Sequence, residues 1–220
     1  SIDQYDKKVL MKKIIFVSTG RCGTKRLYEI LKTKKLNAVV KHQMRFSRIA
    51  NVVGHFMYSV KESDYVKERL YNIITSDFLY KQCFICTDPL TSMIIPKKVI
   101  NDPDTMIVHI TRPEDEVACS LFKISRNRLK SFIAHNFIPF WQIGILPLEN
   151  LINNKVINKY RNMCKMKNLY FYEKYSSNPN YIKISMEEVF YTETLTKLLK
   201  AFLDKDVTFS SLEMSKKSNM

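Results

Sequence analysis

The sequence has no apolar run that approaches the ~20 residues a membrane-spanning helix requires. It also lacks internal repeats, low-complexity tracts and an identifiable linker. These absences favour a single domain that comprises residues 1–220. Glycine is scarce, with 4 residues, and tryptophan occurs once. Hydrophobic residues make up 45% of the chain and aromatic residues 12%, which is typical of a folded globule and not of a disordered protein.

The cysteines provide no even disulfide framework, because there are five of them. An odd, dispersed set favours a reducing compartment and predicts a cytoplasmic protein. Since the sequence begins with Ser1 and not with Met, removal of an upstream targeting segment or anchor stays open as an alternative. Cys83 and Cys86 form a C-x-x-C pair, but no second pair or nearby histidine completes a zinc set, so we predict no metal and a buried structural role.

Acidic residues are also in short supply. The 36 Lys and Arg residues outnumber the 21 Asp and Glu residues, which gives a net charge of +15. Such an excess favours anionic partners, and a nucleotide, an acidic glycan, a membrane surface and a nucleic acid all qualify. Charge alone does not choose among them.

Residues 13–31 (KIIFVSTGRCGTKRLYEIL) carry the most informative pattern of the chain. The β-branched, apolar residues 14–17 predict a short buried parallel strand. Leu27, Ile30 and Leu31 follow at helical spacing and predict an amphipathic helix. A strand, a loop and a helix in this order direct successive backbone N–H groups and the positive end of the helix dipole at one point.

The loop between that strand and that helix has the composition of an anion cradle. Gly20 and Gly23 permit a tight path, while Arg21 and Lys25 add positive charge. Cys22 is either an activated thiolate or, as we favour, a small residue that fills the turn. An ordinary strand-to-helix turn is the alternative interpretation of the whole loop.

The spacing of this loop differs from that of a Walker loop. A Walker loop has four residues between its glycines and then Lys followed by Ser or Thr. Here two residues separate Gly20 from Gly23, and Thr24 precedes Lys25. A nucleotide or metabolite kinase with a non-standard loop therefore stays an alternative and not the first hypothesis.

Residues 106–122 (MIVHITRPEDEVACSLF) repeat the strand–turn–helix pattern. Arg112 stands at the predicted carboxyl end of the strand, and Pro113 suits the start of a helix. The guanidinium of Arg112 offers a planar fork for a phosphate, and Ser120, about two turns further on, can donate a hydroxyl hydrogen bond. Two anion sites at the carboxyl ends of two strands fit a ligand with two separated phosphates.

Together, these two motifs resemble those of the sulfotransferases, which use 3′-phosphoadenosine 5′-phosphosulfate (PAPS) and release 3′-phosphoadenosine 5′-phosphate (PAP). The first resembles their 5′-phosphosulfate loop in Arg21, Gly23 and Thr24, and the second their 3′-phosphate motif in Arg112 and Ser120. Lys25 departs from the family pattern, which has a second hydroxyl residue there. The resemblance implies a three-layer α/β/α fold with a central parallel sheet, related to the P-loop NTPases. It also implies a cofactor site made of Gly20, Arg21, Cys22, Gly23, Thr24, Lys25, Arg112 and Ser120.

The same resemblance implies sulfuryl transfer from PAPS to an acceptor hydroxyl, with Arg21 among the catalytic residues. His42, at the end of a predicted strand, is a candidate general base. Gln43 stands where many sulfotransferases have a glutamate, and Asp88 where cytosolic members have a catalytic histidine. Asp88 is therefore the second candidate base, and an N-cap of the following segment is its alternative role.

Residues 132–151 are rich in aromatic side chains, Trp141 among them. This segment predicts an acceptor-site loop or lid, a satellite core, or a patch for a lipid-linked acceptor with peripheral membrane contact. We expect the acceptor to be a saccharide or another small molecule. A basic nucleic-acid-binding module is a further alternative, but the aromatic residues do not alternate with basic ones as a stacking surface requires. Helical spacing further predicts helices over 61–80, 150–175 and 193–203, and a common helical face for Arg126 and Lys130.

Overall fold

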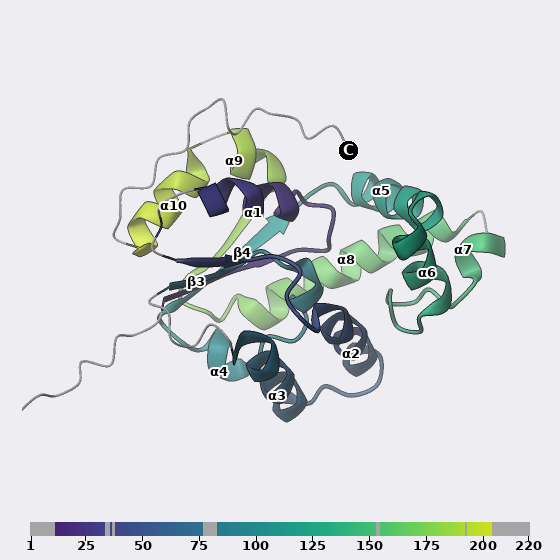
Figure 1. Cartoon of the computed structure of the whole chain (residues 1–220), viewed down its shortest axis with the longest axis horizontal. Coiled ribbons are helices and arrows are strands. Elements are labelled where there is room, and N and C mark those ends of the chain that lie inside the picture. Colours follow the sequence, from purple (N-terminus) through teal and green to yellow (C-terminus); the bar gives the residue numbers. More distant parts are fainter. Residues whose placement is uncertain are drawn as a thin grey trace, which may run out of the picture.

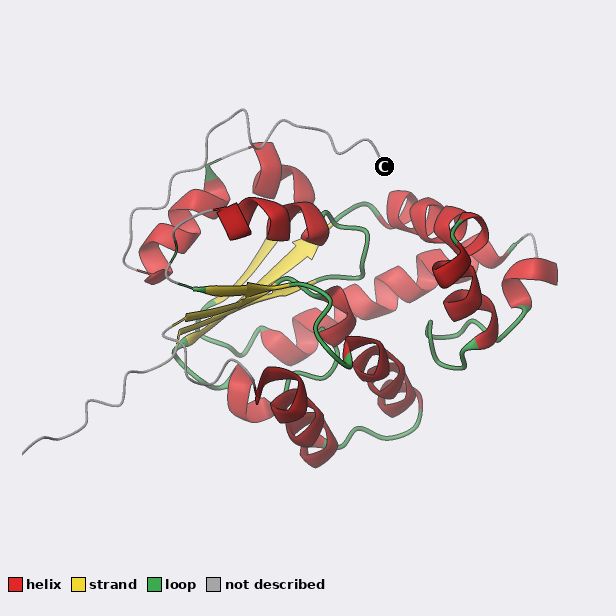
Figure 2. Ribbon diagram, in the orientation of Figure 1, coloured by secondary structure: helices red, strands yellow, loops and turns green. Residues whose placement is uncertain are grey.

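The computed structural model describes residues 12–33, 36, 38–76, 83–152, 155–191 and 193–203. Figure 1 shows the chain as a sheet with helices on both faces, and Figure 2 marks the strands, helices and loops. Its strands are β1 (Lys12–Val17), β2 (Val39–Lys41), β3 (Cys83–Cys86), β4 (Thr105–Thr111) and β5 (Tyr181–Ser185). Its helices are α1 (Thr24–Thr33), α2 (Ser47–Ser59), α3 (Asp64–Thr75), η2 (Pro89–Thr91), α4 (Lys97–Ile100), α5 (Glu114–Asn127), α6 (Leu129–Phe137), α7 (Glu149–Ile152), α8 (Val156–Tyr175), α9 (Met186–Tyr191) and α10 (Thr194–Leu203).

The five strands form one parallel sheet in the order β2-β3-β1-β4-β5. Strand β3, the last four residues of β1 and all but the last residue of β4 are buried, as expected for strands that are covered on both faces. The predicted α/β class with a central parallel sheet is confirmed, and so are the strands predicted at residues 14–17 and 181–185.

Helices cover both faces of the sheet. In Figure 1, α1, α9 and α10 lie on one face, and α2, α3, α4 and α8 lie on the other, while α5, α6 and α7 extend beyond the carboxyl ends of the strands. Helix α1 buries Leu27, Ile30 and Leu31, so its apolar stripe faces the sheet as its spacing predicts.

The strand order defines one topological switch point. From β1 the chain moves outward to β2 at the edge of the sheet, returns to β3 beside β1, and then crosses to β4 on the other side of β1. Ligands of open parallel sheets bind beyond the carboxyl ends of the strands at such a point. Here it lies between β1 and β4, which are followed by the glycine-bearing loop and by Arg112.

Two helix predictions need correction. The helix predicted over 150–175 is wrong at its start, because Lys155 lies in a turn and α8 begins at Val156; residues 153 and 154 lie outside the described part of the chain. Arg126 and Lys130 share no helix, because Arg128 is extended (φ −123°, ψ 117°) and separates α5 from α6.

The helix predicted over 61–80 is confirmed for α3, which begins at Asp64 behind the cap Ser63, whose side chain accepts a hydrogen bond from the Val66 N–H. Residues 77–80 lie outside the described part of the chain. The helix predicted over 193–203 is confirmed as α10. Among the described helices, none is both long and apolar enough to cross a membrane.

Candidate functional site

The loop between β1 and α1 adopts left-handed backbone angles at three of its residues. The φ angles are +89° at Gly20, +59° at Arg21 and +76° at Gly23. Short side chains brace this path: the Gly20 N–H donates to Ser18 Oγ (3.2 Å), and the Cys22 thiol donates to the Gly20 carbonyl (3.3 Å). The loop then enters α1 at Thr24, so that the N–H groups at the start of this helix lie beside it.

Gly23 is required for a second reason besides its φ angle. A Cβ atom at this position would lie 2.4 Å from Cε2 and 2.9 Å from Cζ of Phe190 in α9, which is closer than atoms pack. Gly20 differs, because a Cβ there meets nothing within 4 Å. The Phe190 ring of α9 thus packs against the loop at Gly23, and a larger residue at this position would displace either the ring or the loop.

The structure brings the two predicted motifs into direct contact. Arg112 donates from Nη1 to the Arg21 carbonyl oxygen (3.0 Å), and Arg21 donates from Nε to Ser120 Oγ (2.9 Å). Arg112 also forms an ion pair with Glu116 (2.8 Å) in the first turn of α5. The switch point therefore brings together Arg21, Arg112 and Ser120, although they are up to 99 residues apart in the chain.

Positive charges crowd this contact. Burial, followed by the charges of Arg128 and Arg112, lowers the pKa of Arg21 from its ordinary value. Lys25 points elsewhere: its ammonium lies 3.8 Å from Glu29 on the same helix, and its side chain is 58% exposed. The guanidinium of Arg26 lies over the Phe190 ring, 4.8 Å from its centroid.

Cys22 faces inward. It is fully buried, and burial raises the pKa of its thiol, which disfavours the thiolate. Its sulfur lies 3.7 Å from Thr19 Oγ1. These contacts favour the space-filling role over that of an activated thiolate, while the Cys22 N–H remains part of the loop.

Asp88 follows β3 and is fully buried. Its Oδ1 accepts from the Leu90 N–H (3.0 Å), which makes it the N-cap of η2, and its Oδ2 accepts from the Met44 N–H (3.0 Å). Burial raises the pKa of this carboxyl group above its ordinary value. Because both oxygens accept backbone hydrogen bonds, the geometry favours the cap over the base among the two roles that the sequence left open.

His42 follows β2 and is half-buried. Its Nδ1 lies 2.9 Å from the Thr87 carbonyl oxygen, which can only accept, and its ring stacks on Tyr28 at 5.8 Å between centroids. The hydrogen bond places the ring proton on Nδ1 and leaves the lone pair on Nε2. His42 is therefore prepared to accept a proton, although two strands separate it from β4.

A cavity of about 400 Å³ adjoins Arg112 at the carboxyl ends of β4 and β5. Its lining includes Lys183, Ser185 and the amide of Asn168, together with Arg112 itself. It offers room beside the second motif on the side away from β1.

Residues 132–151 comprise the later part of α6, a loop and the start of α7, and the loop is held by hydrogen bonds from α2. Two residues of α2 hold it: the His55 ring binds the Phe140 carbonyl through Nδ1 (2.9 Å), and Asn51 donates to the Trp141 carbonyl (3.0 Å). The sequence analysis missed both.

Lys167 of α8 was also missed. It is buried, and burial lowers the pKa of its ammonium to about 8; the thiols of Cys22 and Cys164 are close enough to oppose this shift. The signal was available, since Lys167 continues the helical stripe of Tyr160, Cys164 and Phe171, all of which are buried.

No group of three or more His, Cys, Asp or Glu side chains placed to hold a metal occurs among the residues that the structure describes. Cys83 and Cys86 are both buried in β3. Residues three apart in a strand point to opposite faces of the sheet, so this C-x-x-C pair cannot converge on one ion.

Comparison with solved structures identifies the fold. The chain is similar to mouse sulfotransferase SULT7A1, solved in complex with PAP, with a TM-score of 0.53 and 16% identity over 93% of this chain and 65% of that one. It is also similar to the sulfotransferase domain from the curacin biosynthetic pathway, with a TM-score of 0.47 and 12% identity over 93% of this chain and 77% of that one. No family model matches the sequence, and no curated protein matches it.

The architecture is thus the sulfotransferase fold, as the two motifs implied. At 16% identity the likeness establishes the fold alone, and this chain spans slightly less than two thirds of the mouse protein's chain.

Proposed function

We propose that the protein is a PAPS-dependent sulfotransferase that moves a sulfuryl group to an acceptor hydroxyl. The observation that carries this proposal is the contact of Arg112 and Ser120 with Arg21 at the switch point between β1 and β4. A ligand with phosphates at both ends of one nucleoside would contact both motifs at once. The mouse sulfotransferase of the same fold was solved with PAP, a ligand of this kind.

In this proposal, the loop holds the 5′ end of the nucleotide. The N–H groups of Cys22, Gly23 and Thr24 at the start of α1 bind the 5′-phosphate, with Gly20 allowing its close approach. Arg112 and Ser120 bind the 3′-phosphate. The hydroxyl of Ser120 then gives up the hydrogen bond that it accepts from Arg21 and donates one to the phosphate. The cavity of about 400 Å³ beside Arg112 receives part of the nucleoside.

The chemistry is an in-line displacement at sulfur. The acceptor oxygen forms a bond to sulfur as the bond from sulfur to the bridging oxygen of PAPS breaks, and PAP leaves with that electron pair. Arg21 stabilises negative charge on the sulfuryl oxygens and on the leaving phosphate, with Lys25 adding a weaker, more solvent-screened contribution. Nε2 of His42 accepts the proton of the acceptor hydroxyl, since its Nδ1 faces the Thr87 carbonyl.

The acceptor in this proposal is a saccharide or another small molecule that reaches the site past residues 132–151. Their loop is anchored on α2 through His55 and Asn51, so it can present a defined wall to the acceptor.

Thermal unfolding with PAP, ADP and AMP tests the nucleotide assignment. We expect PAP to raise the midpoint more than either mononucleotide does, because only PAP carries the 3′-phosphate for Arg112. Arg112→Ala should remove this preference. The matched control is Arg69→Ala, which removes an exposed arginine of α3 that donates from Nε to the Tyr65 hydroxyl on the same helix (3.1 Å).

A midpoint that rises no more with PAP than with ADP would overturn the proposal. A magnesium-dependent preference for ADP and ATP, with no response to PAP, would instead support the kinase alternative.

A further inference from the structure

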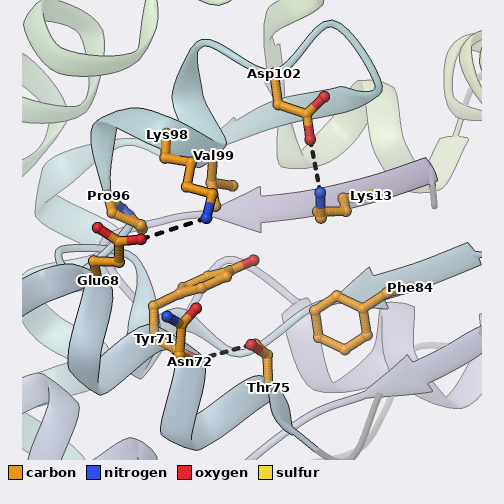
Figure 3. A pocket seen from close by; sticks show the side chains of 10 residues that line it. All are labelled: Lys13, Glu68, Tyr71, Asn72, Thr75, Phe84, Pro96, Lys98, Val99 and Asp102. Atoms are coloured by element: carbon orange, nitrogen blue, oxygen red, sulfur yellow. Dashed lines mark hydrogen bonds and ion pairs between the residues drawn. The ribbon is translucent and has the colours of Figure 1, made fainter. Parts of the chain in front are cut away.

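A second cavity lies at the opposite end of the sheet from the loop. Its volume is about 160 Å³, and it is bounded by the amino ends of β1 and β3, by α3, and by the segment from Pro96 to Asp102. Figure 3 shows these side chains around one space, with the ring of Tyr71 extending into it from α3. Because Lys13 is the second residue of β1 while the loop follows its last residue, most of the length of the strand separates this cavity from the proposed PAPS site.

The walls of this cavity are mainly apolar. Phe84 and Val99 are buried and face it from β3 and α4, and the Tyr71 ring contributes a further aromatic surface. An apolar cavity of about 150 Å³ is large enough to bind benzene, so this one has room for a single ring.

One polar group in the wall of the cavity is left without a partner among the described residues. The Tyr71 residue is 7% exposed, and its hydroxyl finds no hydrogen-bond partner among the described residues. A buried hydroxyl without a partner destabilises a protein, so such groups are rare unless a ligand or water satisfies them. Burial raises the pKa of Tyr71 far above its ordinary value, and the hydroxyl therefore stays protonated and able to donate.

The charges at the rim compensate one another. Lys13 pairs with Asp102 (2.6 Å), and Lys98 pairs with Glu68 (3.5 Å), as Figure 3 shows. Two cations and two anions leave no net charge among these four residues, so the rim has no excess charge that would favour an ionic ligand.

We propose that this cavity is a binding site for an uncharged ligand of single-ring size whose one hydrogen-bond acceptor receives the Tyr71 hydroxyl. The apolar walls select the ring, the compensated rim excludes a charged group, and the buried hydroxyl selects an acceptor such as a carbonyl oxygen. The site is separate from the proposed PAPS site and does not depend on the proposed function.

Methyl NMR of the whole chain with two probes of nearly the same shape tests this site. Acetophenone has a carbonyl group at the position where ethylbenzene has a methylene group, so only acetophenone offers a hydrogen-bond acceptor. Both probes should shift the methyl resonances of Val99, and acetophenone should bind about five-fold more tightly, as expected for one buried hydrogen bond. Tyr71→Phe deletes only the hydroxyl, so it should bind both probes with equal affinity.

Tyr65→Phe is the matched control, since it deletes an exposed hydroxyl from the same helix and should preserve the preference for acetophenone. Absence of Val99 shifts with either probe up to saturation would overturn the proposal. A preference for acetophenone that survives Tyr71→Phe would do so as well, and so would equal affinities in the wild-type protein, which would mean that water satisfies the hydroxyl. Stabilisation by PAP should be the same in Tyr71→Phe as in the wild type, which separates this test from that of the proposed function.

Discussion

Replacing each loop glycine by alanine should separate backbone strain from steric contact. Gly20 and Gly23 both have left-handed φ angles, +89° and +76°, but only Gly23 lies against a neighbouring side chain. Alanine in a left-handed conformation costs roughly 1–2 kcal/mol. For Gly20→Ala we expect this loss and no more, because its Cβ would enter open space.

Gly23→Ala adds a clash to the strain. Its Cβ would lie 2.4 Å from Cε2 of Phe190, so the ring or the loop must move. Overpacking of this kind costs about 1–3 kcal/mol, which brings the expected loss to about 2–5 kcal/mol in total. Since this clash falls on a residue of the loop, and Gly20→Ala causes none, PAP should also stabilise Gly23→Ala less than Gly20→Ala.

Urea unfolding of both variants measures the two losses, with the slope of the transition as a check that the same surface unfolds. A double-mutant cycle with Phe190→Leu isolates the contact: Gly23→Ala should be less harmful by about 1–3 kcal/mol in that background. Gly20→Ala, combined with Phe190→Leu, should show no such coupling. Equal losses for the two glycines, or zero coupling at Gly23, would refute a close approach of α9 to the loop.

Three further predictions concern buried side chains. His109 and His135 each have a pKa lowered by burial from 6.5 to about 4, so the unfolded chain binds more protons between these values. Stability should therefore fall as pH falls from about 6.5 to about 4, by at most roughly 3 kcal/mol per histidine; a flat profile in urea unfolding would contradict this. Iodoacetamide should label exposed Cys119 before buried Cys22, and early labelling of Cys22, read by mass spectrometry, would disprove the inward orientation. Asp88→Asn should lower the unfolding free energy by about 1–3 kcal/mol, since an amide has one acceptor for two backbone N–H groups; an unchanged value would exclude the double cap.

The parts of the fold that the sequence predicted are those with a strong local pattern. The continuous apolar run of β1 and the stripe of Leu27 and Leu31 in α1 each determine an element by burial alone. The boundary between α5 and α6 has no comparable local signal. A contact between the two helices accompanies it: Asn136 of α6 donates to the Ser125 carbonyl near the end of α5 (3.1 Å).

The site was predictable in the residues that the two motifs contain, but not in how they are held. Arg21, Arg112 and Ser120 were expected on one ligand, but nothing in the sequence indicated that they contact one another. Lys25 looked equivalent to Arg21 in charge, yet the helix directs it to Glu29. A side chain's direction depends on the element that carries it, so charge and spacing identify candidates and the fold selects among them.

The way in which the arginines are held bears on how the site could act. Arg21 keeps a left-handed backbone, and its carbonyl accepts from Arg112, while its guanidinium donates to the neutral hydroxyl of Ser120. Burial, and then the charges of Arg128 and Arg112, lower the pKa of Arg21, so the cations repel one another at the place where the two motifs meet. Strain and like-charge repulsion of this kind persist only where the surrounding structure enforces them. In the proposed reaction, a ligand with phosphates at both ends would relieve this repulsion without first having to assemble the cations, which is the electrostatic preorganisation that transfer of a charged group requires.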